Sequence, residues 1–287
     1  MLGTGSVNGE EKKDFAPCKG ILQTGDLILE ANGQFMENKE MLMEMVEKSE
    51  GEAVSLLVER NGKERNLSVR PVFSVADGSY KIGAWVRDSI QGIGTMTYID
   101  PNSGTFGALG HGVYDADTDL LMDIRGGSLT EAELTGIVKG QKGKAGELTG
   151  RIELQEKMGA IEENMETGIF GKAEELLLAG ESLTVANRNE IRKGKAEILS
   201  DLEGKGVCSY EIEIEGFGKK ESRNHKDMTI RITDKRLLQL TGGIVQGMSG
   251  SPIIQDGKLV GAVTYVLVND PTRGYGIFIE DMLNAAG

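Results

Sequence analysis

Short apolar runs separated by glycine turns constrain the fold of this chain more than any other feature. Glycine accounts for 41 of the 287 residues, about 14% and roughly double its usual share. From residue 73 onward the runs are short and several alternate apolar and polar residues, as half-buried strands do. They lie at 82–86, 94–99, 210–214, 228–232, 259–267 and 276–279. Many short strands joined by glycine turns predict an antiparallel β-sandwich or β-barrel.

Residues 1–72 follow a different order of elements, with turn pairs such as Asn32-Gly33 and Asn61-Gly62 between them. In order, these are an apolar run at 21–29, a helix at 38–50 with apolar residues at helical spacing, and alternating strands at 54–58 and 67–69. The pattern predicts a small α+β unit, followed by a second domain over residues 73–287.

This order, together with the segment GILQTGDLILEANG at 20–33, resembles the C-terminal two-thirds of a PDZ domain. The resemblance implies that extended peptides add a strand to a sheet edge of this unit. Only residues 1–6 remain to form the loop that would hold the peptide carboxylate. We therefore expect the PDZ-like unit to be incomplete at its start. The alternative is a small packing domain without a ligand.

In the second domain, the segment GMSGSP at 247–252 sets Ser249 between glycines, ahead of an apolar run. Glycines permit tight turns and close approach of another molecule. Ser249 is therefore a candidate nucleophile, and the alternative is a plain turn residue.

A serine nucleophile needs a base within hydrogen-bond reach, and the chain holds only two histidines, His111 and His225. Both precede Ser249, which excludes the α/β-hydrolase order and leaves the chymotrypsin-like order with histidine first. Small residues flank His111, whereas His225 lies in a polar run typical of a surface loop. We favour His111 as the base, and the alternative is a packed histidine at a strand end.

Asp234 is a candidate to orient the imidazole, because it ends the predicted strand at 228–233 and lies between His111 and Ser249 in the chain. The alternative is a solvated aspartate at a strand end. Further candidates are Asp115, Asp117, Asp119 and Asp123. The first three resemble the start of a calcium loop, but Leu120 and Gly126 occupy its required glycine and glutamate positions. We expect no metal and no cofactor.

The net charge of −13 disfavours binding to nucleic acid and to anionic lipid headgroups. We expect the two cysteines, Cys18 and Cys208, to be unpaired, with Cys208 a packed thiol at the start of a strand. A cysteine peptidase that uses Cys208 with His225 is a weakly supported alternative. We find no apolar stretch long enough for a transmembrane helix and no signal peptide at the start.

Several segments together strongly resemble the SpoIVB peptidases, sporulation serine proteases with a PDZ domain ahead of the peptidase domain. They are IGAWVRDS at 82–89, GIGT at 92–95, ALGH at 108–111 and GMSGSPII at 247–254. The resemblance implies a mainly β fold, in which the PDZ-like α+β unit precedes a chymotrypsin-like antiparallel β-barrel. It maps the catalytic triad onto His111, Asp234 and Ser249. The backbone N–H groups of Gly247 and Ser249 are the expected oxyanion hole.

The resemblance also implies a substrate and a place. Members of the family cleave a membrane-bound regulatory protein between the two forespore membranes, which leads to activation of a late sigma factor, and self-processing is expected too. The PDZ domain implies peptide segments as partners. The alternative is a catalytically inert, PDZ-containing binding scaffold.

Overall fold

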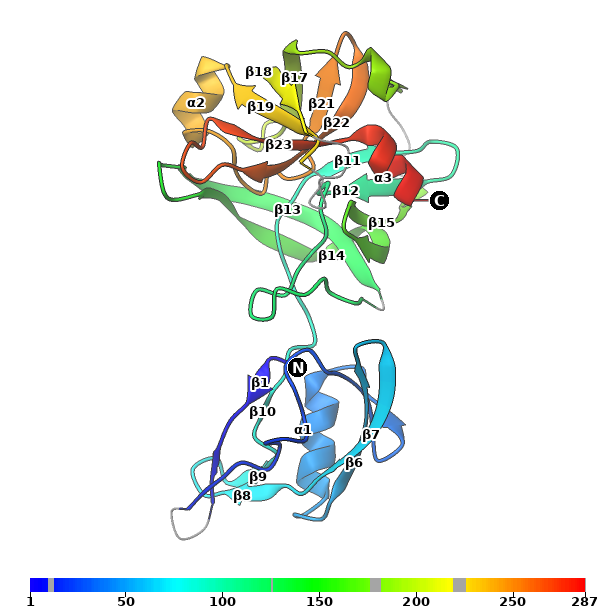
Figure 1. The fold of residues 1–287 in the computed structure, drawn as a ribbon, viewed down its shortest axis with the longest axis vertical. Helices are drawn as coiled ribbons and strands as arrows, with labels where there is room; N and C mark the ends of the chain where they lie inside the picture. Colours follow the sequence, from blue (N-terminus) through cyan, green and yellow to red (C-terminus); the bar gives the residue numbers. More distant parts are fainter. Residues whose placement is uncertain (10–12, 125, 176–181, 219–225, 287) are drawn as a thin grey trace. The chain divides into compact units, whose positions relative to one another are not determined.

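The computed structural model describes residues 1–9, 13–124, 126–175, 182–218 and 226–286. The chain divides into two compact units (Figure 1). The first comprises Met1–Gln91 with Asp115–Leu120, and the second comprises Gly92–Tyr114 with Leu121–Gly287.

The first unit is built on a four-stranded antiparallel sheet and one helix, as the sequence predicts. The sheet has the order β5-β4-β6-β7, formed by Gln34–Phe35, Leu27–Ala31, Val54–Arg60 and Lys63–Val69. Helix α1 spans Lys39–Lys48, and the side chain of Asn38 caps it by accepting a hydrogen bond from the Met41 N–H. Leu42 and Val46 of α1 pack on the buried face of β6 because both lie on one side of the helix.

Three small two-stranded pairings complete this unit. They are β1 (Gly3–Thr4) with β10 (Ala84–Trp85), β2 (Val7–Asn8) with β3 (Asp14–Phe15), and β8 (Val72–Ser74) with β9 (Ser79–Lys81). The first unit therefore continues to Gln91 by contact, and the division at residue 72 remains a prediction.

The second unit begins with a six-stranded barrel, in which β11-β12-β15-β14-β13 pair in this order as antiparallel neighbours and β20 pairs with β14 in parallel. The strands are Met96–Ile99, Thr105–Ala108, Gly168–Ala173, Gly146–Met165, Gly127–Val138 and Val245–Gln246, respectively. The long hairpin of β13 and β14 (Figure 1) carries many exposed charged residues, which is why the apolar pattern of the sequence did not predict it.

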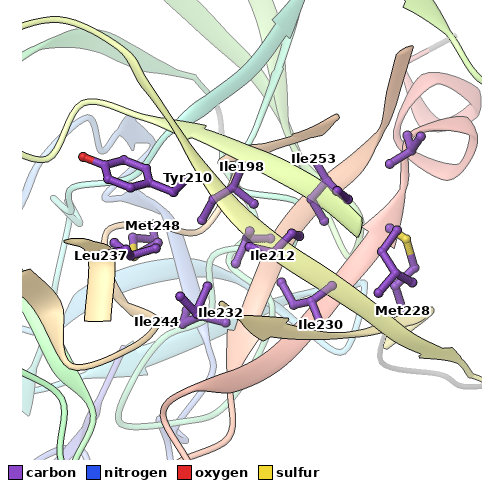
Figure 2. Close-up of a cluster of buried hydrophobic side chains, with 14 of the residues drawn as sticks. Ile198, Tyr210, Ile212, Met228, Ile230, Ile232, Leu237, Ile244, Met248 and Ile253 are labelled. Carbon is purple, nitrogen blue, oxygen red and sulfur yellow. The ribbon is translucent and has the colours of Figure 1, made fainter. Parts of the chain in front are cut away.

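The rest of the second unit is a seven-stranded sheet in the order β16-β22-β21-β17-β18-β19-β23, in which β23 also pairs with β22. The strands are Thr184–Val185, Lys258–Val266, Pro252–Gln255, Gly194–Ser200, Cys208–Phe217, Met228–Ile232 and Arg273–Phe278. A 3₁₀ turn (Arg188–Glu190) and the helices α2 (Lys235–Thr241) and α3 (Ile279–Ala285) complete it. Figure 2 shows the main core, where Met248 packs among isoleucines of this sheet.

The predicted fold class is confirmed: the chain is mainly β, with an α+β unit ahead of an antiparallel barrel. Both cysteines are free, as expected. Cys18 is buried, and burial raises the pKa of its thiol to about 12. Cys208 is exposed, so the prediction of a packed thiol at this position was wrong. None of the helices in the described ranges has the length and apolar character needed to span a bilayer.

Candidate active site

Ser249 lies in the turn between β20 and β21, and two glycines shape that turn. Gly247 (φ +99°) and Gly250 (φ +93°) adopt left-handed backbone conformations that favour glycine. A side chain at Gly250 would also overlap the backbone of Thr95. The preceding residue, Met248, is fully buried in the core and so anchors the turn. The spacing of small residues that identified Ser249 in the sequence is thus required by the turn itself.

The Ser249 hydroxyl is directed at strand β22. Its Oγ donates a hydrogen bond of 2.9 Å to the backbone carbonyl of Thr264. A hydroxyl has one proton to donate, so Ser249 cannot donate to a histidine at the same time. A rotation about its Cα–Cβ bond is needed before it can do so.

His111 follows β12, where Leu109 (φ +67°) and Gly110 (φ +69°) turn the chain. Its ring stacks on Tyr265, with 5.0 Å between the ring centroids and 22° between the planes. Nδ1 lies 2.8 Å from the backbone carbonyl oxygen of Gly112. Because a carbonyl oxygen only accepts, this contact places the proton on Nδ1 and leaves Nε2 free to accept one. That tautomer is the one a general base requires.

His111 and Ser249 both contact strand β22. The two residues contact neighbouring positions of that strand, Tyr265 and Thr264. The backbone of Thr95 links the Ser249 turn to the loop that carries His111. The Thr95 N–H donates to the Ser249 carbonyl (2.9 Å), and the Thr95 carbonyl accepts from the Leu109 N–H (3.1 Å). Segments that are 138 positions apart in the chain are therefore held against the same strand.

Burial controls the charge of His111. Removal of the ring from water lowers its pKa below the usual 6.5, and the hydrogen bond to the Gly112 carbonyl only partly opposes this shift. The imidazole is therefore neutral at pH 7 and can take up a proton.

The backbone N–H groups of Gly247 and Ser249, on either side of Met248 in the chain, are the expected oxyanion-hole donors. The N–H of Met248 bonds to Val245 and the N–H of Gly250 bonds to Val263. Within the described part of the chain, the N–H groups of Gly247 and Ser249 have no such partner. The Gly247 carbonyl accepts a hydrogen bond from Thr95 Oγ1 at 3.0 Å. This bond holds the peptide group between Gly247 and Met248 in place. Two unpaired donors beside a candidate nucleophile can stabilise an oxyanion.

Asp234 lies elsewhere in the second unit, as the N-cap of α2. Its carboxylate accepts from the N–H groups of Arg236 (2.8 Å) and Leu237 (3.1 Å) and pairs with the Arg236 guanidinium at 2.9 Å. Burial alone would raise the pKa of this carboxyl, but these hydrogen bonds outweigh burial and lower it to about 2.

The strand register separates Asp234 from His111. Thr229 of β19 pairs with Tyr275, and Tyr275 of β23 faces the part of β22 that holds Thr264. Asp234 lies five residues beyond Thr229, which corresponds to roughly 16 Å at the rise of a strand. Among the described residues, this carboxylate contacts Glu211, Arg236 and Leu237, and the orienting role of Asp234 stays a prediction.

The remaining candidates contribute no further group to this site. Asp115 and Asp117 pair with Arg87 in the first unit. His225 lies outside the described residues. Across the parts of the chain that the structure describes, no group of three or more His, Cys, Asp or Glu side chains is arranged to hold a metal ion. Sequence reasoning missed Tyr265, because its stacking partner lies far away in the chain and leaves no local pattern.

A serine flanked by glycines and a neutral histidine, both in contact with β22 of a mainly β fold, are typical of serine endopeptidases. Residues 78–283 match the SpoIVB peptidase S55 family, and the chain belongs to this family.

Three solved structures are similar to parts of the chain. The PDZ domain of an SdrC-like protein from Listeria monocytogenes is 18% identical, with a TM-score of 0.22, over 29% of this chain and 85% of that one. The active form of the Rv3671c protease from M. tuberculosis is 16% identical, with a TM-score of 0.33, over 46% and 65%. The HtrA-type protease AlgW with a decapeptide is 12% identical, with a TM-score of 0.39, over 79% and 54%.

Proposed function

We propose that this endopeptidase acts in sporulation signalling, with Ser249 as nucleophile and His111 as general base. Its substrates are a membrane-bound regulatory protein and its own chain, and cleavage leads to activation of a late sigma factor. The observation that supports the catalytic part is that the serine and the histidine contact adjacent residues of β22. Membership of the SpoIVB peptidase family supports the signalling part.

The chemistry follows from the geometry of the two side chains. Ser249 Oγ turns from the Thr264 carbonyl towards His111, gives its proton to Nε2 and attacks the peptide carbonyl carbon. The protonated imidazole then gives that proton to the leaving amine. Water then gives a proton to Nε2 as it attacks the acyl-enzyme, and the imidazolium returns that proton to Ser249 Oγ as the acyl group leaves.

The N–H groups of Gly247 and Ser249 are the proposed donors to the oxyanion that forms on the attacked carbonyl. Loss of one such donor costs about 3 kcal/mol of transition-state stabilisation in a comparable peptidase. Strand β22 adjoins the nucleophile, and we propose that it pairs with the substrate backbone.

The family places the reaction between the two forespore membranes, which we propose as the location of this chain too. We also propose that peptide segments, including segments of the substrate, bind at a sheet edge of the PDZ-like unit. The helix and strands that flank such a groove in PDZ domains correspond in order to α1 and the sheet of β4–β7.

Mass spectrometry of the protein's own termini tests the catalytic assignment. The purified chain is incubated alone and with casein, beside the variants Ser249→Ala and Ser128→Ala. We expect new termini and casein fragments with the wild type and with Ser128→Ala, whose serine is exposed on β13. Ser249→Ala should yield neither. Equal cleavage by Ser249→Ala would show that Ser249 is not the nucleophile.

A second candidate function is an inert scaffold that binds peptides, which the hydrogen bond of Ser249 to Thr264 favours. A fluorophosphonate reagent separates the two functions, since it labels only an activated serine. Labelling of the wild type but not of Ser249→Ala supports the peptidase. No labelling in the presence of substrate peptide supports the scaffold.

A further inference from the structure

A lysine lies over two tyrosine rings next to the candidate active site. Lys226 is half-buried and precedes β19. Its Nζ is 4.9 Å from the centroid of the Tyr275 ring and 5.9 Å from the centroid of the Tyr265 ring. The negative face of an aromatic ring attracts an ammonium group at such distances. The two contacts therefore hold a long and flexible side chain over β22 and β23.

The pairing of the strands explains why one ammonium group reaches both rings. Tyr265 belongs to β22 and Tyr275 to β23, and these two strands pair with each other. Strand β19 pairs with β23 as well, and ahead of it the N–H of Asp227 donates to the Gly276 carbonyl at 3.0 Å. This bond fixes the backbone directly after Lys226, so the sheet itself determines where the lysine lies.

Tyr265 connects Lys226 to the candidate base. The His111 ring stacks on Tyr265 with 5.0 Å between the ring centroids. Because Lys226 Nζ is 5.9 Å from the same Tyr265 centroid, it lies at most 10.9 Å, the sum of these two distances, from the centroid of the His111 ring. An extended peptide advances about 3.3 Å per residue. About three substrate residues therefore cover this distance.

The charge of Lys226 has no carboxylate partner among the residues that the structure describes. Two arginines on the neighbouring strands differ in this respect, since Arg231 and Arg273 both pair with Glu215, at 2.9 and 3.0 Å. In a chain with a net charge of −13, a cation without an anionic partner beside the active site is available to an anionic ligand.

Tyr265 does not supply the missing anion. Burial raises the pKa of its hydroxyl, and the charges of Tyr114 and Glu166 raise it further. The Tyr265 side chain is therefore neutral at pH 7. Glu166 acts on the hydroxyl of this residue, whereas Lys226 lies over its ring.

We propose that Lys226 is a specificity-determining residue, which binds an Asp or Glu side chain of the substrate within three residues of the scissile bond. This inference rests on the proposed function of Ser249 and His111 and adds the substrate class of that site. A substrate strand that pairs with β22 presents alternate side chains to the face where the lysine lies. The neutral rings hold the ammonium group and leave its charge for the carboxylate.

Peptide cleavage tests this subsite. In a peptide that the wild type cleaves, taken from its casein fragments, Glu is placed in turn at three positions on either side of the scissile bond, with Gln at the same position as the control. We expect a kcat/KM about three- to tenfold higher for Glu than for Gln at one or more positions, as for a partly exposed ion pair. The ratio should fall towards one in about 0.5 M NaCl. Equal cleavage of the Glu and Gln peptides at all positions would overturn the inference.

Substitutions of Lys226 separate its charge from the packing of its stem. Lys226→Arg should keep the Glu-to-Gln ratio above one, and Lys226→Met should bring it to one. Lys226→Glu should lower it below one and favour Lys at the same position. The matched control is Lys193→Glu, which changes an exposed lysine whose neighbour Arg192 contacts Gln255, at the end of β21 far from Ser249. It should keep the wild-type ratio.

The remaining outcomes decide the inference in both directions. A wild-type ratio in Lys226→Met would overturn it, because the charge would then have no role. Circular dichroism checks that each variant is folded, and if Lys226→Met is not, the ratio in Lys226→Glu decides. Full activity of Ser249→Ala would defeat the proposed function as well, whereas an inactive Ser249→Ala beside equal cleavage of the Glu and Gln peptides by the wild type defeats this inference alone.

Discussion

At the scale of single residues, hydrogen bonds to the backbone hold the candidate site in place. Ser249 donates to the carbonyl of Thr264, and His111 uses the carbonyl of its neighbour Gly112. Ser249 must turn away from the Thr264 carbonyl before it can act in catalysis. The imidazole of His111 already has the tautomer that catalysis needs. The tyrosine ring beneath it, Tyr265, shields it from water. The chemistry therefore depends on one side-chain rotation and on burial.

Burial predicts how activity varies with pH. Because desolvation lowers the pKa of His111 below 6.5, the acid limb of the kcat/KM profile should lie below pH 6.5. As the pH falls, His111 takes up a proton in the unfolded chain before it does so in the folded chain. The free energy of unfolding should therefore decline below about pH 6.5. A pH–rate profile with a peptide substrate measures the limb. A limb above pH 7 would contradict burial as the controlling factor.

At the scale of elements, Asp234 begins a helix. It receives the N–H groups of the first turn of α2, and Leu237 of that helix is buried in the main core. A sequence pattern that marks the end of a strand cannot distinguish a cap from a catalytic carboxylate, because both follow a strand and both are acidic.

Asp234→Ala should lower the free energy of unfolding of the second unit by about 1–2 kcal/mol, whereas Asp234→Asn should retain most of the cap. The folded pKa of about 2 lies below the ordinary 3.8. The stabilisation by the charged form is therefore complete above about pH 4 and is lost as the pH falls towards 2. Urea unfolding at pH 7 and pH 3 measures both effects. Equal stability of Asp234→Ala and wild type at pH 7 would contradict the capping role.

At the scale of the whole molecule, the two units have separate cores. The core of the first unit is formed by residues such as Leu42 and Leu56, and the largest core of the second by residues such as Ile198 and Ile230. In the first unit, the buried carboxylate of Asp26 pairs with Arg60 at 2.6 Å and accepts from the N–H of Gln23. Removal of one partner leaves a buried charge uncompensated.

We expect Asp26→Ala to destabilise the first unit by about 3 kcal/mol and to leave the second unit unchanged. The single tryptophan, Trp85, belongs to the first unit and reports on it by fluorescence. Circular dichroism follows both units. Asp14→Ala, which changes an exposed aspartate of β3, is the control. A shift of the whole circular dichroism transition together with the fluorescence would show that the units unfold as one.

Local periodicity was sufficient to predict helix α1, the hairpin of β6 and β7 and strands such as β19. The glycines around Ser249 and the scarcity of histidine were sufficient to single out His111 and Ser249. These features depend on short-range sterics and on residue type, which a sequence displays directly.

The long hairpin of β13 and β14, the cap at Asp234 and the contacts of His111 and Ser249 with β22 were decided by tertiary structure alone. The half-buried residues of this hairpin alternate with many exposed charged ones and include few apolar residues in a row, so its apolar pattern is weak. The same carboxylate caps a helix or orients a ring according to what the fold places beside it. The contact of His111 with Tyr265, far along the chain, depends on strand register in the folded sheet, and register is set by the packing of the whole sheet.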